Sequence, residues 1–481
     1  KYKLERNMKK GLLALGALFA ICLSMLATDM VVKQKNGEIK KFNVEDVEEV
    51  IFNENSNIPN DSTVVDASET FLLFNILSDS TAEVDGLRIG GVDELIIPAK
   101  VRIAGKEYTV TSIKDFAFDT NYLGSVMIPS SITKLYGLTI STNFTVSKDN
   151  PAFSSLDGVL YDKEKTKVIK APEKLKGDLV IPASVTSIGE SAFYDCVDLT
   201  NIKIPEGVTS IGAGAFSDCS SLTNINIPEG VTSIGESTFF GCASLTSINI
   251  PEGVTSIGAS AFYGCSNLTS INIPEGVTSI GEGAFYLCNG LDPKLLVYDK
   301  GTKCYGWIGD KKKCTEVVIP EGVTSIGASA FYWCNSLASI KIPEGVTSIG
   351  EYAFYNCSNL TSINIPEGVT SIGEYAFYWC NNLTSINIPE GVTSIGEYAF
   401  YNCSGLTSIN IPKSVTTIGR ETFCKCSNLT SVNIPEGVKS IGTSAFSGCS
   451  RLDVVIDNSK DNVKVGYDAF YGCKSVTWLK E

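Results

Sequence analysis

Tyrosine and tryptophan residues recur at fixed steps in the second half of the chain and are the side chains best suited to binding a ligand. They flank a repeated phenylalanine, at positions where we expect the side chain to point outward. Exposed tyrosine and tryptophan are enriched at recognition surfaces, because each ring offers a large apolar area and a polar group. The sequence therefore predicts an aromatic binding surface, or else rings that only cover neighbouring repeats and stiffen them. Its members are Tyr332, Trp333, Tyr352, Tyr355, Tyr375, Tyr378, Trp379, Tyr398 and Tyr401.

Earlier repeats carry small residues where three of these tyrosines stand. Ser237 and Ser260 occupy the position of Tyr352, Tyr375 and Tyr398. Maintenance of the repeat alone would not require tyrosine at that position in only three copies. We therefore expect that replacing the three tyrosines with serine weakens partner binding without melting the fold.

Asparagine residues form a second candidate surface. One asparagine recurs at the end of most predicted strands, where side-chain amides can bond to one another along a stack of similar repeats. The same uncharged face could instead receive a polar ligand such as a glycan or an extended peptide. The candidates are Asn364, Asn387, Asn410 and Asn433.

Glutamate recurs directly after a repeated Ile-Pro pair. Equivalent glutamates in stacked repeats would lie about 5 Å apart and repel one another, so salt or divalent cations should raise the melting temperature. A calcium site needs several converging oxygens, which a straight row does not ensure, and we expect no metal site. The glutamate file comprises Glu206, Glu229, Glu252, Glu275, Glu321, Glu344, Glu367, Glu390 and Glu436.

Composition excludes several classes of function. The chain has 481 residues, 53 acidic against 39 basic, and its formal net charge of -14 argues against nucleic acid or an anionic membrane as a partner. Histidine is absent, which removes the commonest general base, the Ser/His and Cys/His nucleophile pairs and histidine-containing metal sites. The sequence also lacks a phosphate-binding loop and a G-x-S-x-G motif. We therefore expect neither an enzyme nor a bound cofactor.

Twelve of the 16 cysteines occupy one repeat position. Their equivalent β-carbons should lie near the interstrand spacing of about 4.8 Å, whereas a disulfide needs about 3.8 Å. We therefore expect buried free thiols that act as small apolar groups. Cys304 and Cys314 lie in an irregular repeat, and a local disulfide between them remains an alternative.

The N-terminal residues 8–27 have the features of a secretory signal peptide. Two lysines precede an apolar run over residues 11–26, which is too short for a comfortable membrane span. Cleavage near Ala27 is expected, with lipid anchoring at Cys22 as the alternative. Since no other long apolar segment follows, we expect no membrane span in the mature chain and a secreted or cell-surface location.

A small β-rich module and a linker are predicted to follow the signal. Alternating apolar and polar residues flank Asn36-Gly37, a pair that suits a tight hairpin turn. This pattern predicts a β-rich module over residues 29–57. Residues 58–70 are rich in polar residues and show no apolar period, so they are predicted to be a linker.

An Ile-Pro pair recurs every 23 residues over most of the chain, with a single interval of 46. Because the long interval is twice the short one, it contains one irregular repeat, at about residues 291–317, and the stack continues through it. A period of about 20 to 29 residues is typical of a leucine-rich-repeat solenoid, in which no repeat can bury its apolar face alone. The prolines are Pro182, Pro205, Pro228, Pro251, Pro274, Pro320, Pro343, Pro366, Pro389, Pro412 and Pro435.

One repeat, residues 365–387, predicts how each coil is built. Alternation around Ile386 predicts a half-buried strand. Pro389 and Gly391 then turn the chain into a second short run, residues 392–395. Residues 397–406 are predicted to form a single helical turn. The fold class is therefore a repeat solenoid of 23-residue β-strand, turn and short-helix coils, preceded by the small β-rich module. The predicted core positions are Ile365, Val369, Ile372, Ala376, Phe377, Cys380, Leu383 and Ile386.

The repeats divide the rest of the chain into three parts. Residues 71–180 are predicted to hold an N-terminal cap, divergent repeats and a hairpin insert. Residues 181–449 form the regular array. Residues 450–481 make a longer and more charged repeat, as expected of a solvent-facing cap.

The string I-P-E-G-V-T-S-I-G-x-x-A-F-x-x-C-x-x-L-T-S-I-N resembles the repeat of BspA-like leucine-rich-repeat surface proteins, the treponemal-type class of this repeat. The resemblance covers residues 83–478, and phenylalanines from Phe118 to Phe470 fall at the family's Ala-Phe or Thr-Phe position. Residues 157–163 and 297–300 resemble the family's hairpin insert. The N-terminal module resembles one that is common in exported proteins of gut or oral anaerobes.

The resemblance implies a bacterial cell-surface or secreted protein that binds host proteins or other cells. We therefore expect a protein-binding scaffold, an adhesin for host matrix proteins or other cells. A surface glycan-binding module is the alternative, suggested by the aromatic and asparagine surfaces. The expected partners are host extracellular or cell-surface proteins, with glycans or other bacteria as further candidates.

Overall fold

The computed structural model describes residues 29–33, 39–43, 62–88, 92–118, 123–138 and 142–480 of the chain. The chain divides into two compact units, unit 1 (Lys1–Asp198) and unit 2 (Leu199–Glu481). The described ranges contain strands, turns and three short 3-10 helices, and no α-helix occurs in them. Within these ranges, no helical segment has the length and apolar character that crossing a bilayer requires. The predicted signal peptide and Cys22 lie outside the described residues.

The first described elements of unit 1 are two antiparallel strands, β1 (Asp29–Lys33) and β2 (Ile39–Asn43). Their register places Asp29 opposite Asn43 and Lys33 opposite Ile39. These are the strands expected on either side of Asn36-Gly37, and the turn itself lies outside the described residues.

The linker predicted over residues 58–70 is partly structured. Strand β3 (Val64–Asp66) pairs in parallel with β7 (Lys100–Ile103), and the 3-10 helix η2 (Ala67–Glu69) follows directly. The linker prediction is therefore wrong over these residues. Two adjacent valines favour an extended backbone, and here they add a strand to an existing sheet.

Two sheets form the next part of unit 1. A mixed sheet has the order β3-β7-β8-β5-β4, with β10 beside β8, and a parallel sheet has the order β11-β9-β6. Their apolar side chains form one core that includes Leu72, Val110 and Phe118. The additional strands are β4 (Leu72–Ile76), β5 (Thr81–Leu87), β6 (Val92–Ile96), β8 (Lys106–Ile113), β9 (Leu123–Ile128), β10 (Lys134–Leu135) and β11 (Asn143–Val146).

The predicted hairpin insert is present at the end of unit 1. Strands β12 (Phe153–Leu156) and β13 (Val159–Asp162) pair antiparallel, and β14 (Lys167–Lys170) extends the same sheet. Strand β14 then pairs in parallel with β16 (Ser187–Ile188), after the short strand β15 (Gly177–Val180). The hairpin thus leads the chain into the regular coils.

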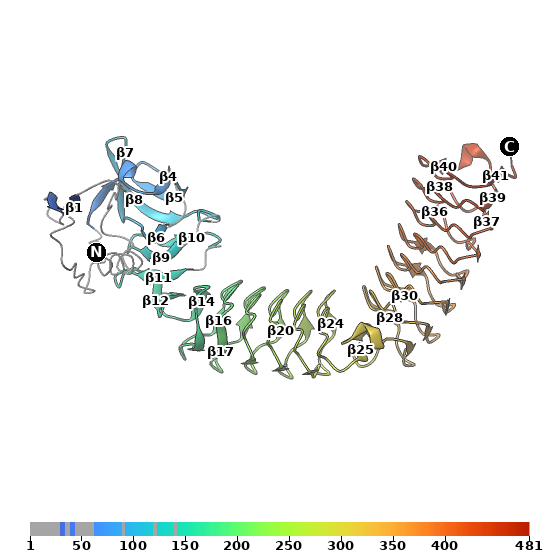
Figure 1. Cartoon of the computed structure of the whole chain (residues 1–481), viewed down its shortest axis with the longest axis horizontal. Helices are drawn as coiled ribbons and strands as arrows, with labels where there is room; N and C mark the ends of the chain where they lie inside the picture. Colours follow the sequence, from blue (N-terminus) through green and yellow to red (C-terminus); the bar gives the residue numbers. More distant parts are fainter. Residues whose placement is uncertain are drawn as a thin grey trace. The chain divides into compact units, whose positions relative to one another are not determined.

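Unit 2 is a stack of coils, each of which contributes short strands to parallel ladders (Figure 1). In the repeat analysed above, β31 (Ser362–Asn364) pairs with β33 (Ser385–Asn387), and β32 (Ser371–Ile372) pairs with β34 (Ser394–Ile395). All eight predicted core positions are buried, with at most 6% of Ile386 exposed. The predicted leucine-rich-repeat solenoid is therefore confirmed.

The strands that follow the repeated buried leucine, such as Leu383, lie on one side of the coils. They are β17 (Leu199–Lys203), β19 (Asn224–Asn226), β21 (Ser247–Asn249), β23 (Ser270–Ile271), β27 (Glu316–Val318), β29 (Ser339–Lys341), β31, β33, β35 (Ser408–Ile409), β37 (Ser431–Ile434), β39 (Asp453–Ile456) and β41 (Ser475–Trp478). The strands that precede the glycine turn form the second ladder. They are β18 (Ser210–Ile211), β20 (Ser233–Ile234), β22 (Ser256–Ile257), β24 (Ser279–Ile280), β28 (Ser325–Ile326), β30 (Ser348–Ile349), β32, β34, β36 (Thr417–Ile418), β38 (Ser440–Ile441) and β40 (Lys464–Val465).

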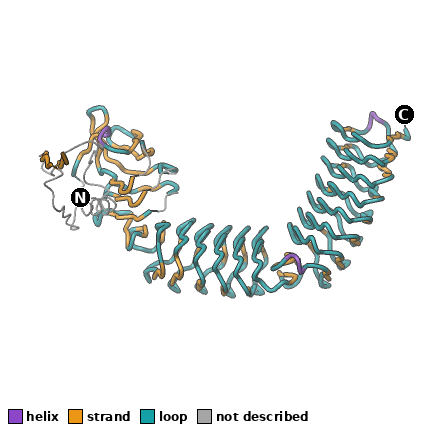
Figure 2. The backbone as a smooth tube through the Cα atoms, in the orientation of Figure 1, coloured by secondary structure: helices purple, strands orange, loops and turns teal. Residues whose placement is uncertain are grey.

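The third part of each coil is a run of turns, where we expected a helical turn (Figure 2). In residues 397–406, two residues adopt the left-handed conformation, Tyr398 at φ 56° and Asn402 at φ 54°. Left-handed residues at these positions interrupt helical hydrogen bonding, and backbone N–H groups donate to carbonyl oxygens of the next coil instead. Phe400 N donates to Thr422 O at 2.8 Å and Asn402 N to Cys424 O at 2.8 Å. The short-helix expectation is wrong because this segment forms a third intercoil ladder.

The irregular repeat keeps the stack continuous. Strand β25 (Lys294–Tyr298) pairs antiparallel with β26 (Lys303–Ile308), which is the second hairpin expected from the sequence. Strand β26 then pairs in parallel with β28, after the 3-10 helix η3 (Lys311–Lys313). On the other side, Asp299 N donates to Val277 O at 3.2 Å and Phe285 N to the Tyr305 hydroxyl at 3.1 Å.

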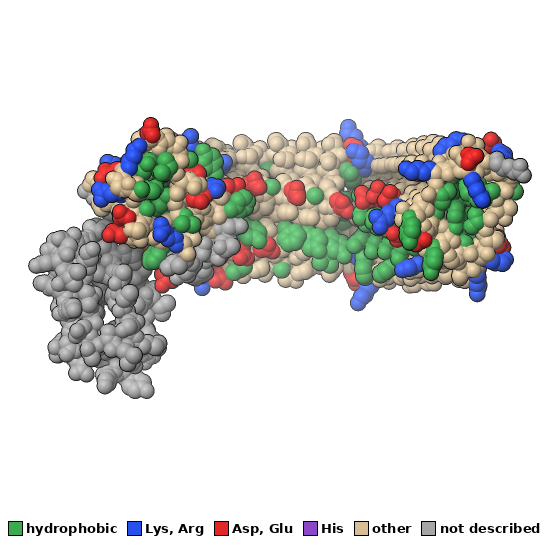
Figure 3. All heavy atoms as spheres, turned by 90° about the horizontal axis from the view of Figure 1, so that it is seen from above, with side chains coloured by type: hydrophobic (Ala, Val, Ile, Leu, Met, Phe, Trp, Pro, Cys, Tyr) green, Lys and Arg blue, Asp and Glu red, His purple; other side chains and the backbone are tan. Residues whose placement is uncertain are grey.

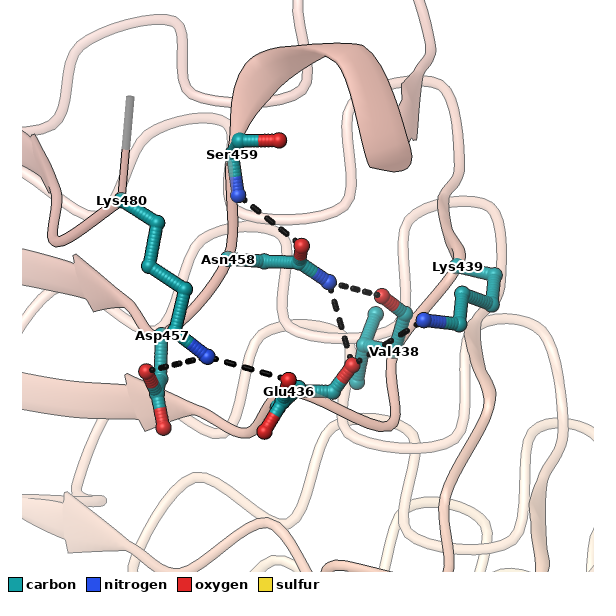
Figure 4. A network of polar contacts seen from close by, with 7 residues as sticks. All are labelled: Glu436, Val438, Lys439, Asp457, Asn458, Ser459 and Lys480. Carbon is teal, nitrogen blue, oxygen red and sulfur yellow. Dashed lines mark hydrogen bonds and ion pairs between the residues drawn. The ribbon is translucent and has the colours of Figure 1, made fainter.

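The last coil has a charged edge and an apolar end. Lys480 Nζ lies 3.1 Å from Glu436 Oε1 and 3.2 Å from Asp457 Oδ1, and Asn458 donates to the Glu436 carbonyl (Figure 4). The 3-10 helix η4 (Lys460–Asn462) follows this network. Tyr467 and Tyr471 are nevertheless 79% and 69% exposed, which differs from the polar outer face expected of a cap.

Candidate functional site

The turn segments place the candidate aromatic residues in parallel files along unit 2. Each segment has two left-handed positions, and the residue that follows the buried phenylalanine lies between them. The first left-handed position holds Tyr352, Tyr375 and Tyr398 in three successive coils. We call these three residues the short aromatic file.

Rings of the short aromatic file stack face to face. The ring centroids of Tyr352 and Tyr375 are 4.8 Å apart, and those of Tyr375 and Tyr398 are 4.7 Å apart. Their planes differ by 9° and 4°. The coils therefore repeat on this side at nearly the spacing of adjacent strands.

A second file, the long aromatic file, runs beside the first. Its rings succeed one another at centroid distances of 4.8, 5.3, 5.7, 5.0, 4.8 and 4.6 Å. The 5.7 Å contact joins Tyr286 to Tyr332 and bridges the irregular repeat. Members of the long aromatic file are Phe240, Tyr263, Tyr286, Tyr332, Tyr355, Tyr378 and Tyr401.

Three members of the long aromatic file, Phe240, Tyr263 and Tyr286, are absent from the sequence-based candidate surface. The signal that identifies them is their position directly after the buried phenylalanine, which they share with the predicted residues. All nine predicted aromatic residues are joined by ring contacts, including Tyr352 to Tyr355 at 5.8 Å. The structure thus brings the nine together and extends their row past the irregular repeat.

Most rings present edges to solvent, since neighbouring rings cover their faces. The tyrosines of both files are half-buried, whereas Trp333 and Trp379 are 42% and 38% exposed. Trp379 stacks on Tyr378 at 5.5 Å, and Trp333 lies 6.4 Å from Tyr332. Together the two files and the two tryptophans form what we call the aromatic surface. Figure 3 shows a band of hydrophobic side chains along the coils with acidic side chains beside it.

Bulky aromatic residues occupy left-handed backbone positions that most other coils of unit 2 give to small or short polar residues, with Leu287, Glu421 and Lys425 as the exceptions. Tyr352, Tyr375 and Tyr398 have φ of 54°, 52° and 56°, where other coils have residues such as Ser260 and Gly283. Trp333 and Trp379, both at φ 58°, stand where Asn356 and Asn402 stand in the coils between and after them. A left-handed backbone disfavours large side chains by about 1–2 kcal/mol per residue, while glycine and asparagine tolerate it. Fold stability alone does not select these five aromatics.

Carboxylates line the short aromatic file. Glu351, Glu374 and Glu397 directly precede its three tyrosines and are exposed. Burial, and then the charges of Glu374 and Glu282, raise the pKa of Glu351. Burial also raises the pKa of Tyr378, to about 12, with further contributions from neighbouring tyrosines. The surface is therefore acidic, and the Tyr378 phenol remains protonated at neutral pH.

Cations close the files at one end. The guanidinium of Arg420 lies 5.6 Å from the ring centroid of Tyr398, and Lys425 Nζ lies 5.0 Å from that of Tyr401. Arg420 Nε also pairs with Glu421 Oε1 at 3.3 Å. Arg420 takes the place that glutamate holds in the three preceding coils. The molecule itself thus shows a cation held by this combination of tyrosine and glutamate.

The asparagine surface has a different structure from the one expected. Asn364 and Asn387 lie opposite each other in β31 and β33, and all four candidates, with Asn410 and Asn433, are exposed. Within the part of the chain that the structure describes, no hydrogen bond joins these four side chains. The predicted amide ladder is therefore wrong, and threonine supplies the ladder instead.

Threonine hydroxyls donate to the backbone of the preceding coil in two files. Thr384 Oγ1 lies 3.1 Å from Thr361 O, and Thr407 Oγ1 lies 3.2 Å from Thr384 O. In the second file, Thr370 Oγ1 lies 3.4 Å from Thr347 O. Because these bonds run from side chain to backbone, the asparagine side chains beside them are left to solvent.

The cysteine file has a structural role. All 15 cysteines in the described residues are free, among them Cys304 and Cys314. In regular coils the thiol donates to the phenylalanine carbonyl of the preceding coil, as from Cys380 Sγ to Phe354 O at 3.2 Å. Cys357 N donates to the same oxygen at 3.1 Å. Burial raises the pKa of Cys380 to about 12, so the thiol stays protonated and can keep donating.

Metal binding receives no support from the described side chains. No group of three or more cysteine, aspartate or glutamate residues among them is arranged to hold a metal ion. The exposed glutamates after the Ile-Pro pairs form the predicted row, which Lys413 interrupts between Glu390 and Glu436.

Comparisons with known proteins agree with the coil structure. The family model for the BspA type leucine rich repeat region matches six copies, over residues 173–292, 309–429 and 349–477. A leucine rich cell surface protein from Faecalibacterium prausnitzii is 31% identical, with 75% of this chain and 92% of that chain covered and a TM-score of 0.47. A leucine-rich repeat protein from Bacteroides ovatus is 24% identical, with 85% and 98% covered and a TM-score of 0.42. No curated protein matches the chain.

Proposed function

Because the chain belongs to the BspA-type leucine-rich-repeat family, we propose that it is a secreted or cell-surface scaffold that binds proteins through its aromatic surface. In this proposal it acts as an adhesin for host matrix proteins or other cells. The 31% identical Faecalibacterium protein is described as a cell surface protein, and residues 8–27 have the features of an export signal.

One observation carries the choice of surface. Five large aromatic side chains stand at left-handed backbone positions, where most other coils use serine, glycine, asparagine or aspartate and a few use Leu287, Glu421 or Lys425. Residues held in unfavourable backbone conformations cluster at functional sites. Tyrosine and tryptophan also dominate the energetically important contacts of protein interfaces.

Ring geometry favours a protein ligand over a glycan. A sugar ring packs against the open face of an aromatic ring, but neighbours at 4.6–4.8 Å cover the faces of Tyr375 and Tyr378. The exposed phenol hydroxyls instead suit hydrogen bonding with a protein. The two tryptophans add apolar area of the kind found at interface centres.

A solid-phase binding screen tests this function. The chain lacking residues 1–27 would be assayed against a panel of extracellular matrix proteins, intact cells and a glycan array. The test variant changes Tyr352, Tyr375 and Tyr398 to Ser, which other coils carry at this position. The matched control changes Asn364, Asn387 and Asn410 to Ser on the strand side.

We expect saturable binding to a protein, weakened on the order of tenfold or more in the tyrosine variant and retained in the asparagine control. Thermal unfolding of both variants would establish that each is folded. Binding to glycans alone, or protein binding that the tyrosine variant leaves unchanged, would contradict the proposal.

A further inference from the structure

The aromatic surface has the charge and spacing to recognise one class of protein segment. Resting on the function proposed above, we propose that its ligand is an extended basic segment in the polyproline II conformation, with a cationic side chain at every third residue. This segment would lie along the stack, across the coils that carry Trp333 and Trp379.

Charge supports a cationic ligand. Glu351, Glu374 and Glu397 present one exposed carboxylate per coil beside the short aromatic file. Among the described residues, no lysine or arginine forms an ion pair with any of the three. A cation in this row would relieve the repulsion between neighbouring carboxylates, and the chain's net charge of -14 would attract a basic partner from a distance.

The chain's own cations show how such a ligand can be held. Arg420 lies over the Tyr398 ring while it pairs with Glu421, and Lys425 lies over the Tyr401 ring. Each uses the ring face that is left uncovered where its tyrosine file ends. Farther along the files the faces are covered, so a ligand cation is expected to pair with glutamate and donate to the phenol oxygens. Guanidinium groups suit this role because they donate several hydrogen bonds in a fixed plane, which matches carboxylate and hydroxyl acceptors.

Spacing along the stack selects the conformation of the ligand. Successive tyrosine centroids lie 4.6–4.8 Å apart, and Trp333 and Trp379 belong to coils two steps apart. Two steps correspond to about 9.6 Å at the usual interstrand spacing of about 4.8 Å. Three residues of polyproline II rise about 9.3 Å, whereas alternate residues of a β-strand rise about 6.7 Å. A polyproline II segment therefore returns to an equivalent contact every two coils, and a β-strand does not.

The two exposed tryptophans supply contacts that recur every two coils, as a polyproline II segment requires. Asn356 separates Trp333 from Trp379 in the file of second left-handed positions, so large and small side chains alternate. Aromatic side chains also line the surfaces that bind proline-rich segments. Because such a segment is already extended when free, it loses less conformational freedom on binding than a flexible chain does.

The test uses the chain without residues 1–27 and three synthetic peptides of equal length. One peptide repeats Arg-Pro-Pro, the second repeats Glu-Pro-Pro, and the third repeats Arg-Gly-Ser. Calorimetry at low and high salt would measure their dissociation constants. We expect the Arg-Pro-Pro peptide to bind at least about tenfold more tightly than either other peptide, and more weakly at high salt.

Two variants built from the repeat's own residues test the site. Trp333→Asn with Trp379→Asn installs the residue that Asn356 and Asn402 provide in other coils, and Glu351→Ala with Glu374→Ala installs the residue found at Ala259 and Ala328. Both variants should stay folded, with the tryptophan variant at least as heat-stable as the parent. Each should weaken Arg-Pro-Pro binding on the order of tenfold.

The outcomes separate this inference from the function on which it rests. Equal binding of the Arg-Gly-Ser peptide, or tighter binding of the Glu-Pro-Pro peptide, would overturn the ligand class. If no peptide binds but a matrix protein still binds in a manner that depends on Tyr352, Tyr375 and Tyr398, the ligand class is wrong and the proposed function stands. Arg-Pro-Pro binding that both variants leave unchanged would also overturn the proposal, since the ligand would then lie elsewhere.

Discussion

Coils on the two sides of the irregular repeat have the same backbone conformation and the same types of core residue but differ on their surface. Before it, Ser260 adopts φ 52° and Phe262 stacks on Phe285 at 5.5 Å. After it, Tyr375 adopts φ 52° and Phe354 stacks on Phe377 at 5.2 Å. The same left-handed position thus accepts serine or tyrosine without a change in backbone.

This comparison separates residues that the fold needs from residues that it only tolerates. Phenylalanine, cysteine and leucine recur in the core on both sides with no exposed area, as at Phe262 and Phe377. The tyrosines of the short aromatic file occur on one side only. We therefore attribute the first group to stability, and the function proposed above assigns the second to recognition.

Truncating the buried phenylalanine should have the largest effect, and the same effect on both sides. We expect Phe262→Ala and Phe377→Ala each to lower the free energy of unfolding by about 3–5 kcal/mol, because each leaves a cavity and breaks a stacked file. Urea denaturation would measure both. A much smaller loss for one of them would show that the two cores are not equivalent.

Removing one thiol should have the next largest effect. Cys380→Ala deletes a buried sulfur and leaves Phe354 O with a single donor, Cys357 N. We expect a loss of about 1–3 kcal/mol, and a similar loss for Cys265→Ala on the other side. Cys424→Ala is the matched control, because Cys424 lies outside the thiol file. Equal losses at Cys380 and Cys424 would show that the thiol hydrogen bond contributes little.

The core and the coil period could be predicted from the sequence, because burial of a repeated apolar pattern leaves little choice. A residue such as Phe377 has to be inside whatever path the turn takes. The two hairpins could be predicted for a similar reason, since their turn residues and alternating strands are local signals.

Hydrogen-bond direction could not be predicted in the same way. A tyrosine such as Tyr398 gives no sign that its backbone is left-handed, so a helical turn was the natural expectation for residues 397–406. The choice between Asn387 and Thr384 as the ladder residue depends on which side chain reaches a carbonyl of the preceding coil. At the aromatic surface, the bridge from Tyr286 to Tyr332 depends on how the irregular repeat folds.

Transplanting tyrosine across the irregular repeat would sharpen the comparison with a smaller effect. Ser237→Tyr with Ser260→Tyr recreates the short aromatic file in the earlier coils. We expect a net change in the free energy of unfolding of no more than about 1 kcal/mol, because ring stacking offsets most of the conformational cost. Thermal and urea unfolding would measure it. A loss of several kcal/mol would mean that the later coils contain a further adaptation to tyrosine.

Charge on the glutamate row should give the smallest effect. Lys413 stands between Glu390 and Glu436, whereas the row from Glu206 to Glu275 has no such interruption. Lys413→Glu should therefore lower the free energy of unfolding by about 0.2–1 kcal/mol at low salt, and the loss should shrink as salt screens the repulsion.

The reverse change in the earlier coils gives the opposite sign and serves as its counterpart. Glu252→Lys breaks the uninterrupted part of the row and should stabilise the chain by a similar amount at low salt. Lys413→Gln, which removes charge without adding a carboxylate, should fall between the parent and Lys413→Glu. If the melting temperatures of all three variants do not respond to salt, the exposed carboxylates are too well solvated to repel one another. The glutamate row would then contribute nothing to stability on either side of the irregular repeat.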